Sequence, residues 1–450
     1  MGHDSIPFQV LNEHAMDTST LYNLKPIGLG TAYSESLTSY LIRLSESHCI
    51  SVGTLFNKFV SKKLNKPYVN RSVKCGGNRF FDGAKALNGV DKNSNDLINA
   101  LEDLTYRNDL IYLTLQVWGN VFTNRELLKE YLSWCPYCLK EFENRHKICY
   151  MPLQWYLKPV KYCVVHQTAL VDNCFNCNKK LPILHRSSNN NSCPYCKAKL
   201  TNIPFGFKEK IENIDREKYY SKNIADLIAI TNTISNKLYR DIIKTRINKL
   251  EVQYTDINQI SIRKELEIPK STFYSWQKGL SLPTIRNILE ICYSLGLSLQ
   301  DFLFKENLII QPILKSPVVV KIPRRKLDHA KIEKSLQSYL EIAEPLSMVQ
   351  ISKDIQVAKR SLYRIHPQLC KSLSQRYQEY LLLKSDIRTQ EIKLLIEQSV
   401  NALIFQGSVP TQKKIENILY ANCLLRESFA REYLGNYLNS LNNQNKEKEN

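Results

Sequence analysis

The stretch CVVHQTALVDNCFNC, residues 163–177, places three cysteines and one histidine within fifteen positions. Outward from it, a Cys135/Cys138 pair lies on the N-terminal side and a Cys193/Cys196 pair on the C-terminal side. In every pair two residues intervene, and this spacing lets a tight turn direct both side chains at one metal ion. The stretch therefore predicts two small modules, each folded around a metal.

The pairs combine into two sets of four ligands. The first set, with the spacing C-x2-C-x24-C-x2-H, comprises Cys135, Cys138, Cys163 and His166. The second set, with the spacing C-x2-C-x15-C-x2-C of a zinc ribbon, comprises Cys174, Cys177, Cys193 and Cys196. Four ligands close a tetrahedral site, so we expect two structural Zn²⁺ ions, each worth on the order of 10 kcal/mol of folding free energy.

Two other interpretations of the cysteines fit the spacing less well. A thioredoxin-like redox motif would need one CxxC beside a βαβ pattern, and four pairs in a row argue against it. A catalytic zinc site would leave one coordination position free, whereas the ligands here fill two closed sites. His146 and Cys149 lie close enough in sequence to replace a ligand of the first set.

Composition bounds the class of protein. A chain of 450 residues predicts two to four domains, and no apolar run approaches the ~18 residues of a spanning helix. The first residues lack the order of an export signal, so we expect a cytoplasmic protein with reduced cysteines and no membrane contact. A net charge of +19 favours a polyanion such as nucleic acid, although a generally solvated basic surface is the alternative.

Hydrophobic periodicity predicts a mainly α-helical, multi-domain fold. Leu37, Tyr40, Leu41 and Leu44 recur at helical spacing behind Ser34, a candidate N-cap. The expected segments are an N-terminal helical domain (1–130), a double zinc region (131–204), a helical connector (205–255), a helix-turn-helix domain (256–312), two further helical modules (326–385 and 386–441) and a disordered tail (442–450).

Residues 260–304 have the punctuation of a helix-turn-helix. A first helix with Ile262 ends at a turn around Pro269, a second helix ends at Gly279, and Pro283 opens a third. This stretch resembles the DNA-binding domains of the phage repressors and Cro. With Phe273 and Trp276 facing the core, the side chains left for DNA are Lys270, Ser271, Thr272, Tyr274, Gln277 and Lys278. An ordinary helical bundle is the alternative.

Further basic residues are candidate DNA contacts. Arg324, Arg325 and Lys326 lie in a Pro-containing linker that could follow phosphates or serve as a solvated tether. Arg360 and Arg364 fall on the expected second helix of the 326–385 module, which is a helix-turn-helix or a plain helical unit with a basic face.

One motif resembles a known family. Residues 34–51, SESLTSYLIRLSESHCIS, resemble the opening helix of the TniQ/TnsD transposon target-selection proteins, whose pattern is roughly E-S-L-x-S-W-x-x-R-L-A. Matching positions are Glu35, Ser36, Leu37, Ser39, Arg43 and Leu44; Tyr40 replaces the Trp and Ser45 the Ala. The zinc pairs follow in the expected order, and the C-terminal modules are similar to those of the longer, TnsD-like branch.

The resemblance implies a non-enzymatic selector in a bacterial transposition system, some of which are CRISPR-associated. Such a protein binds double-stranded DNA at an attachment site and recruits an AAA+ ATPase, which brings the transposase. The alternatives are a TniQ-type adaptor docked on an RNA-guided effector complex, a zinc-containing transcription regulator, and a zinc-dependent nuclease or hydrolase. The absence of an HExxH helix speaks weakly against the last.

Overall fold

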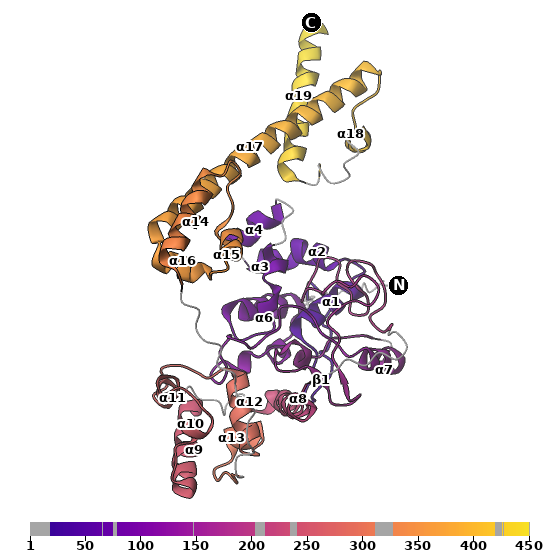
Figure 1. Cartoon of the computed structure of the whole chain (residues 1–450). Coiled ribbons are helices and arrows are strands. Elements are labelled where there is room, and N and C mark those ends of the chain that lie inside the picture. The colour runs from indigo at the N-terminus through magenta and orange to yellow at the C-terminus, as the bar shows by residue number, and fades with distance from the viewer. Residues whose placement is uncertain are drawn as a thin grey trace, which may run out of the picture. The chain divides into compact units, whose positions relative to one another are not determined.

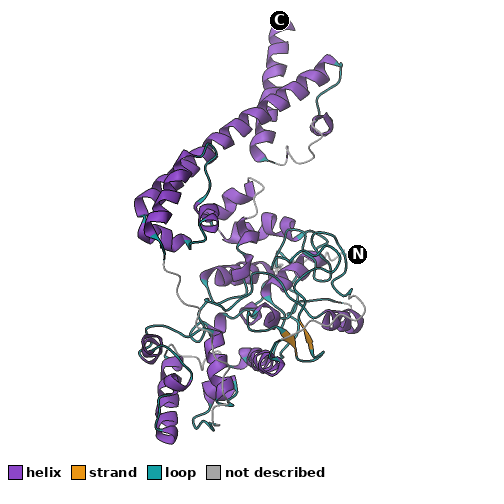
Figure 2. Ribbon diagram, in the orientation of Figure 1, coloured by secondary structure: helices purple, strands orange, loops and turns teal. Residues whose placement is uncertain are grey.

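The computed structural model is mainly helical, as the sequence predicted (Figures 1 and 2). It describes residues 19–64, 66–74, 79–146, 148–202, 212–234, 241–310, 327–418, 425 and 427–449. The chain divides into two compact units. The first comprises Met1–Val73 and Gly77–Pro317, and the second comprises Lys74–Gly76 and Val318–Asn450.

Helix α1 (Leu37–Ser47) lies at the centre of the first unit. The predicted apolar face is fully buried, with Leu37, Tyr40, Leu41 and Leu44 each 0% exposed. The N-cap is Ser36 and not the predicted Ser34, because the Ser36 hydroxyl accepts a hydrogen bond from the backbone N–H of Ser39.

Short helices surround α1. They are α2 (Val52–Leu55), the π-helix η1 (Phe56–Val60), α3 (Ser61–Leu64), α4 (Pro67–Lys74), α5 (Arg79–Asp82), α6 (Lys92–Thr105) and the 3-10 turns η2 (Ala84–Ala86), η3 (Leu110–Leu113) and η4 (Gln116–Trp118). The longest of these, α6, begins behind Asp91, whose carboxylate accepts from two backbone N–H groups.

The cysteine-rich region contains little regular structure. It holds α7 (Pro136–His146), the 3-10 turn η5 (Leu153–Tyr156) and two short antiparallel strands, β1 (Tyr162–Cys163) and β2 (Thr168–Ala169), drawn in orange in Figure 2. A backbone bridge between Glu35 and Pro152 ties this region to the segment before α1, and a bridge between Trp134 and Val171 joins two parts of the region itself. This region therefore depends on side-chain clusters for its shape.

The remaining helices of the first unit share its core. They are α8 (Ile214–Ala229), η6 (Thr231–Thr233), α9 (Ile242–Asn258), α10 (Ile262–Glu265), α11 (Lys270–Gln277), α12 (Ile285–Ser294) and α13 (Leu299–Phe304). One cluster of buried apolar side chains extends from Leu21 to Leu308. The predicted connector 205–255 thus does not link two separate cores, because α8 and α9 pack within this one.

The second unit has two small cores joined by one long helix. Helices α14 (His329–Glu341), α15 (Met348–Asp354) and α16 (Lys359–Ile365) pack at one end of α17 (Pro367–Phe405), and α18 (Gln412–Ile418) and α19 (Ser428–Glu449) pack at the other (Figure 1).

The predicted boundary between residues 385 and 386 falls inside α17, and along this helix it lies between the buried residues of the two small cores, Leu373 and Ile392. One prediction about the C-terminal part was wrong. The tail predicted to be disordered, 442–450, is helical as far as Glu449, because extending an existing helix adds one hydrogen bond for each residue ordered.

Candidate metal centres and nucleic-acid interface

Two separate elements present the first metal cluster. Cys135 immediately precedes α7 and Cys138 lies in its first turn. The start of the helix is therefore one knuckle, that is, a tight turn that directs two ligand side chains at one ion. Cys163 lies in β1, and the hairpin formed when Cys163 pairs with Thr168 turns His166 back toward it. The predicted set Cys135, Cys138, Cys163 and His166 is thereby brought together.

The distances in the first cluster fit a tetrahedral ion. The Sγ atoms of Cys138 and Cys163 are 3.6 Å apart, and the three sulfurs lie 3.2 to 3.7 Å from His166 Nδ1. Zn–S bonds of about 2.3 Å in a tetrahedron would separate two sulfurs by about 3.8 Å. The side chains are thus already spaced for Zn²⁺, and the cysteines are free thiols.

The histidine is oriented by a carboxylate. His166 Nδ1 faces the sulfurs while its Nε2 lies 3.0 Å from Glu141 Oε1, one turn along α7 from Cys138. A carboxylate on the outer nitrogen fixes the tautomer that leaves Nδ1 free to ligate. Hydrogen bonds from Cys135 and Cys138 lower the pKa of the Cys163 thiol, whereas hydrogen bonds with Cys135 and Cys163 raise the pKa of the Cys138 thiol. Cys163 is therefore the cysteine of this cluster that most readily becomes a thiolate.

The second cluster consists of two matching knuckles. In the first knuckle, the Cys174 N–H donates to Lys179 O, and the Asn178 N–H donates to Cys174 O. The second knuckle has the same two bonds: the Cys193 N–H donates to Ala198 O, and the Lys197 N–H donates to Cys193 O. Asn178 and Lys197 both have positive φ, +52° and +62°. The two turns are therefore equivalent position by position.

These knuckles bring the predicted set Cys174, Cys177, Cys193 and Cys196 together. The Sγ atoms of Cys174 and Cys196 are 3.6 Å apart, and those of Cys177 and Cys193 are 3.8 Å apart. These separations also fit tetrahedral Zn²⁺. Both clusters could hold a metal ion.

Cys149 and His146 were the alternative ligands for the first set, and the structure describes the side chain of Cys149. The Cys149 thiol donates to Leu139 O at 3.7 Å and is in neither cluster. The side chain of His146 lies outside the described part of the structure.

Helix α11 has the amphipathic character that the sequence predicted. Phe273 and Trp276 are each 4% exposed and pack edge to face. Gly279 closes the helix with φ +70°. The third helix begins at Ile285 behind a Thr284 capping box, two residues later than the predicted opening at Pro283, because the Thr284 hydroxyl supplies the cap.

The residues predicted to contact DNA differ in how exposed their side chains are. Exposed on α11 and its C-cap are Lys270, Ser271, Tyr274 and Lys278. Thr272 and Gln277 are half-buried. Arg360 and Arg364 are both exposed on α16 of the second unit, whereas Arg324, Arg325 and Lys326 lie outside the described residues.

A cavity of about 1080 Å³ lies beside α11. The sequence analysis did not predict the residues that form one of its walls. Ser271 and Thr272 line it on one side; the loop 122–126, with the exposed side chain of Arg125, lines it on the other. Some 150 residues of sequence separate the two walls, so no local pattern could have paired them.

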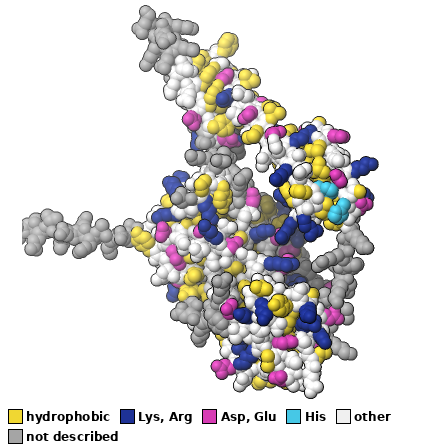
Figure 3. Space-filling view, turned by 90° about the vertical axis from the view of Figure 1, so that its left-hand side faces the viewer, with side chains coloured by type: hydrophobic (Ala, Val, Ile, Leu, Met, Phe, Trp, Pro, Cys, Tyr) yellow, Lys and Arg dark blue, Asp and Glu magenta, His cyan; other side chains and the backbone are white. Residues whose placement is uncertain are grey.

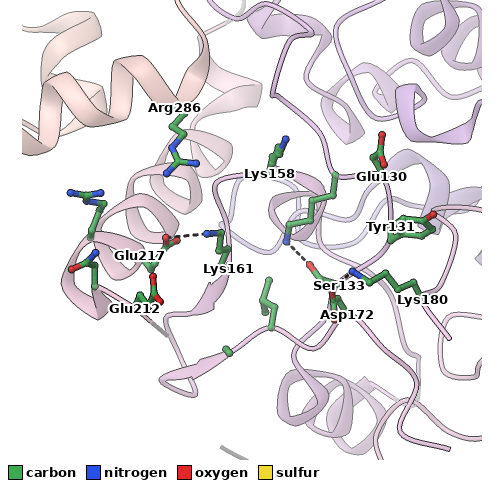
Figure 4. A pocket seen from close by; sticks show the side chains of 15 residues that line it. Glu130, Tyr131, Ser133, Lys158, Lys161, Asp172, Lys180, Glu212, Glu217 and Arg286 are labelled. Carbon is green, nitrogen blue, oxygen red and sulfur yellow. Dashed lines mark hydrogen bonds and ion pairs between the residues drawn. The ribbon is translucent and has the colours of Figure 1, made fainter. Parts of the chain in front are cut away.

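A second cavity, of about 710 Å³, separates the cysteine-rich region from α8 and α12 (Figure 4). In Figure 4 the side chains of Lys161 and Glu217 point toward one another, and Arg286 extends from α12. Lys180 pairs with Asp172 at 3.1 Å, and Lys158 pairs with Glu126. Most cations of this cavity are thus neutralised by nearby carboxylates.

One amine in this cavity has an altered pKa. Lys129 Nζ donates to Ser133 Oγ and to Val160 O. Burial lowers the pKa of Lys129 to about 7, and the nearby carboxylates of Asp172 and Glu217 oppose this shift only in part.

Taken together, the helices and the two four-ligand clusters define a mainly helical, multi-domain protein with two sites that could hold a metal ion. Residues 26–170 match the TniQ family. This part of the chain is a TniQ family domain, which indicates a protein associated with transposition. The match crosses the predicted boundary at residue 130 and includes the whole first cluster. No curated protein sequence matches the chain. Among the described residues, no helix is long and apolar enough to cross a membrane.

Proposed function

We propose that this protein is a non-enzymatic target-site selector of a bacterial transposition system, similar to the longer TnsD-like branch. It binds double-stranded DNA by sequence and recruits an AAA+ ATPase through its TniQ domain, and the ATPase brings the transposase. The observation that carries the proposal is the exposed polar face of α11 in a chain that also contains a TniQ domain.

Helix α11 has the chemistry of a recognition helix. Its apolar side is anchored by Phe273 and Trp276, so the exposed side is held rigidly for contact with base edges. Lys270, at the N-terminus, and Lys278, at the C-cap, would contact phosphates, while Ser271 and Tyr274 lie between them.

The cavity beside α11 supports a DNA path that includes the TniQ domain. Its walls carry hydroxyl and amide groups, including Thr123, Asn124 and Asn287, together with the guanidinium of Arg125. Such groups suit phosphate oxygens. A DNA backbone lying in this cavity would therefore contact loop 122–126 while α11 occupies the adjacent major groove.

The two clusters would hold structural Zn²⁺. Each offers four protein ligands, so a bound ion would have no open position for water or substrate. The ions would thus hold the cysteine-rich region in shape between the TniQ helices and the helix-turn-helix.

The second unit would add affinity. Lys and Arg side chains are distributed over the face shown in Figure 3, among them side chains of the second unit. Arg360 and Arg364, both exposed on α16, would bind phosphates of the same DNA. A second weak contact on the same chain raises affinity through effective concentration.

Selection of bound fragments from genomic DNA, followed by footprinting with and without the ATPase of the same transposition system, tests this proposal. We expect one enriched sequence, a footprint several helical turns long, and protection that extends when the ATPase is added. A protein that enriches no sequence is not a site selector, and that result would favour the adaptor of an RNA-guided complex. A compact palindromic footprint unaffected by the ATPase would instead indicate a transcription regulator.

A further inference from the structure

The second metal module differs from the first in charge. Between Asp172 and Glu209 the sequence contains no carboxylate, whereas the described part of this run carries Lys179, Lys180, Arg186, Lys197 and Lys199. The first module has acids beside its cluster, with Glu141 at His166 and Glu143 on the same helix. A difference this local is not explained by the basic character of the whole chain.

The equivalence of the knuckles separates these lysines into two kinds. Lys180 and Lys199 occupy the same position in the two turns, and each is held by a carboxylate from outside the run: Asp172 at 3.1 Å and Glu143 at 2.8 Å. Lys179 and Lys197 occupy positions where the other knuckle has Ala198 and Asn178. These two lysines are additions to the common turn, which folds without them.

Lys179 and Lys197 are both exposed at the knuckle tips. No described carboxylate forms an ion pair with either of them. Lys179 Nζ lies 5.0 Å from the ring centroid of Tyr195, which belongs to the other knuckle and is 45% exposed. This contact shows that the two tips lie side by side, with Asn176 and Asn178 also exposed there.

We propose that the tips of the second metal module form a nucleic-acid contact in which Lys179 and Lys197 bind successive phosphates of a DNA backbone. Tyr195 holds Lys179 in place through the cation–π contact, and the exposed asparagines donate to the same backbone. The contact is independent of base sequence because lysine recognises phosphate as a point charge. The inference rests on the proposed DNA-binding function, and it assigns part of that function to the second module.

The knuckle equivalence supplies the test variant. Lys179→Ala with Lys197→Asn gives each turn the residue that the other already has at that position, and asparagine accepts the positive φ of residue 197. The matched control, Lys140→Gln with Arg145→Gln, removes the same charge from exposed positions on α7 beside the first cluster. Zinc content and thermal unfolding of the full-length proteins check that both variants are folded.

Binding of the full chain to a fluorescent DNA duplex of arbitrary sequence is measured over a range of salt concentrations. We expect the knuckle variant to lose about 1.8 from the slope of log affinity against log salt, and on the order of 50-fold in affinity near 0.1 M salt. The control should keep the wild-type slope. Equal slopes for wild type and knuckle variant, with wild type binding well, would overturn the inference alone. A wild-type protein that binds no duplex even at low salt would refute the DNA-binding function itself.

Discussion

Arg43 and Glu35 form a buried, two-point ion pair within the motif that resembles the TniQ family. Arg43 Nε and Nη2 lie 3.0 and 2.8 Å from the two carboxylate oxygens of Glu35, which is 0% exposed. Burial raises the pKa of Glu35, and the guanidinium opposes that shift. Ser39, on the same helix, contacts Asn190 and the Met151 N–H of the cysteine-rich region. The motif therefore holds the TniQ helices and the metal modules together.

Loss of Arg43 should be strongly destabilising. Arg43→Ala leaves a buried carboxylate without its partner, and we expect a loss of about 3–5 kcal/mol in unfolding free energy. Urea unfolding followed by tryptophan fluorescence measures it, because the four tryptophans, at 118, 134, 155 and 276, all lie in the first unit. The double variant Glu35→Gln with Arg43→Met should lose less unfolding free energy than Arg43→Ala, because it leaves no unpaired buried charge. A larger loss in the double variant would show that an unpaired Glu35 carboxylate is not the cause of the destabilisation.

Removal of one ligand of the second cluster should unfold that module alone. Cys193→Ser is expected to reduce bound zinc from two ions per chain to one and to make the stretch 173–202 sensitive to protease, because zinc supplies most of the folding free energy of so small a core. Zinc content by atomic absorption and limited proteolysis provide the readouts. Cys49→Ser, at an exposed thiol outside both clusters, is the control. Two ions retained in Cys193→Ser would contradict the ligand assignment.

The carboxylate behind His166 should tune the first cluster. Glu141→Gln removes the negative partner of Nε2, so we expect zinc affinity at this site to fall about 10- to 100-fold. Competition with a chromophoric chelator measures the change. Glu143 lies on the same helix as Glu141 but pairs with Lys199. Glu143→Gln should therefore leave the zinc affinity of the first site unchanged. If both variants release zinc equally, Glu141 has no particular role in orienting His166.

The two faces of α11 should respond differently to substitution. Trp276→Ala removes a buried ring and should destabilise the helix-turn-helix by about 3–5 kcal/mol. Lys270→Gln removes an exposed cation and should leave stability unchanged while reducing the salt slope of DNA binding by about 1. Thermal unfolding and duplex titration separate the two effects. Unchanged DNA binding in Lys270→Gln would place this end of α11 away from the phosphates.

Lys129 should make stability depend on pH. Its pKa in the folded chain is about 7, below the value of about 10.4 for an unperturbed lysine. The unfolded chain therefore binds more protons in this interval, and stability rises with pH between the two values. Relative to Lys129→Met, wild type should lose stability as the pH falls from about 10 to about 7 and change little below that. A pH-independent difference between the two proteins would show that Lys129 stays charged when folded.

Local pattern was enough to predict much of this molecule. A knuckle needs only two cysteines and a turn, and an amphipathic helix needs only apolar residues at the right spacing. For this reason the sequence predicted both ligand sets and the buried faces of α1 and α11. The failures came where two neighbouring serines could each cap a helix, as at the start of α1, or where a helix continues into a polar tail, as in α19.

The sequence by itself determined which residues meet within each metal cluster, since the chemistry of Cys and His allows few other partners. Only the tertiary structure decided what those clusters face. It joined Arg125 to the cavity of α11, directed Nδ1 of His166 inward, and put Lys179 beside Tyr195 on adjacent knuckle tips. Such contacts arise from packing between segments far apart in the chain, and a pattern read along one segment carries no information about them.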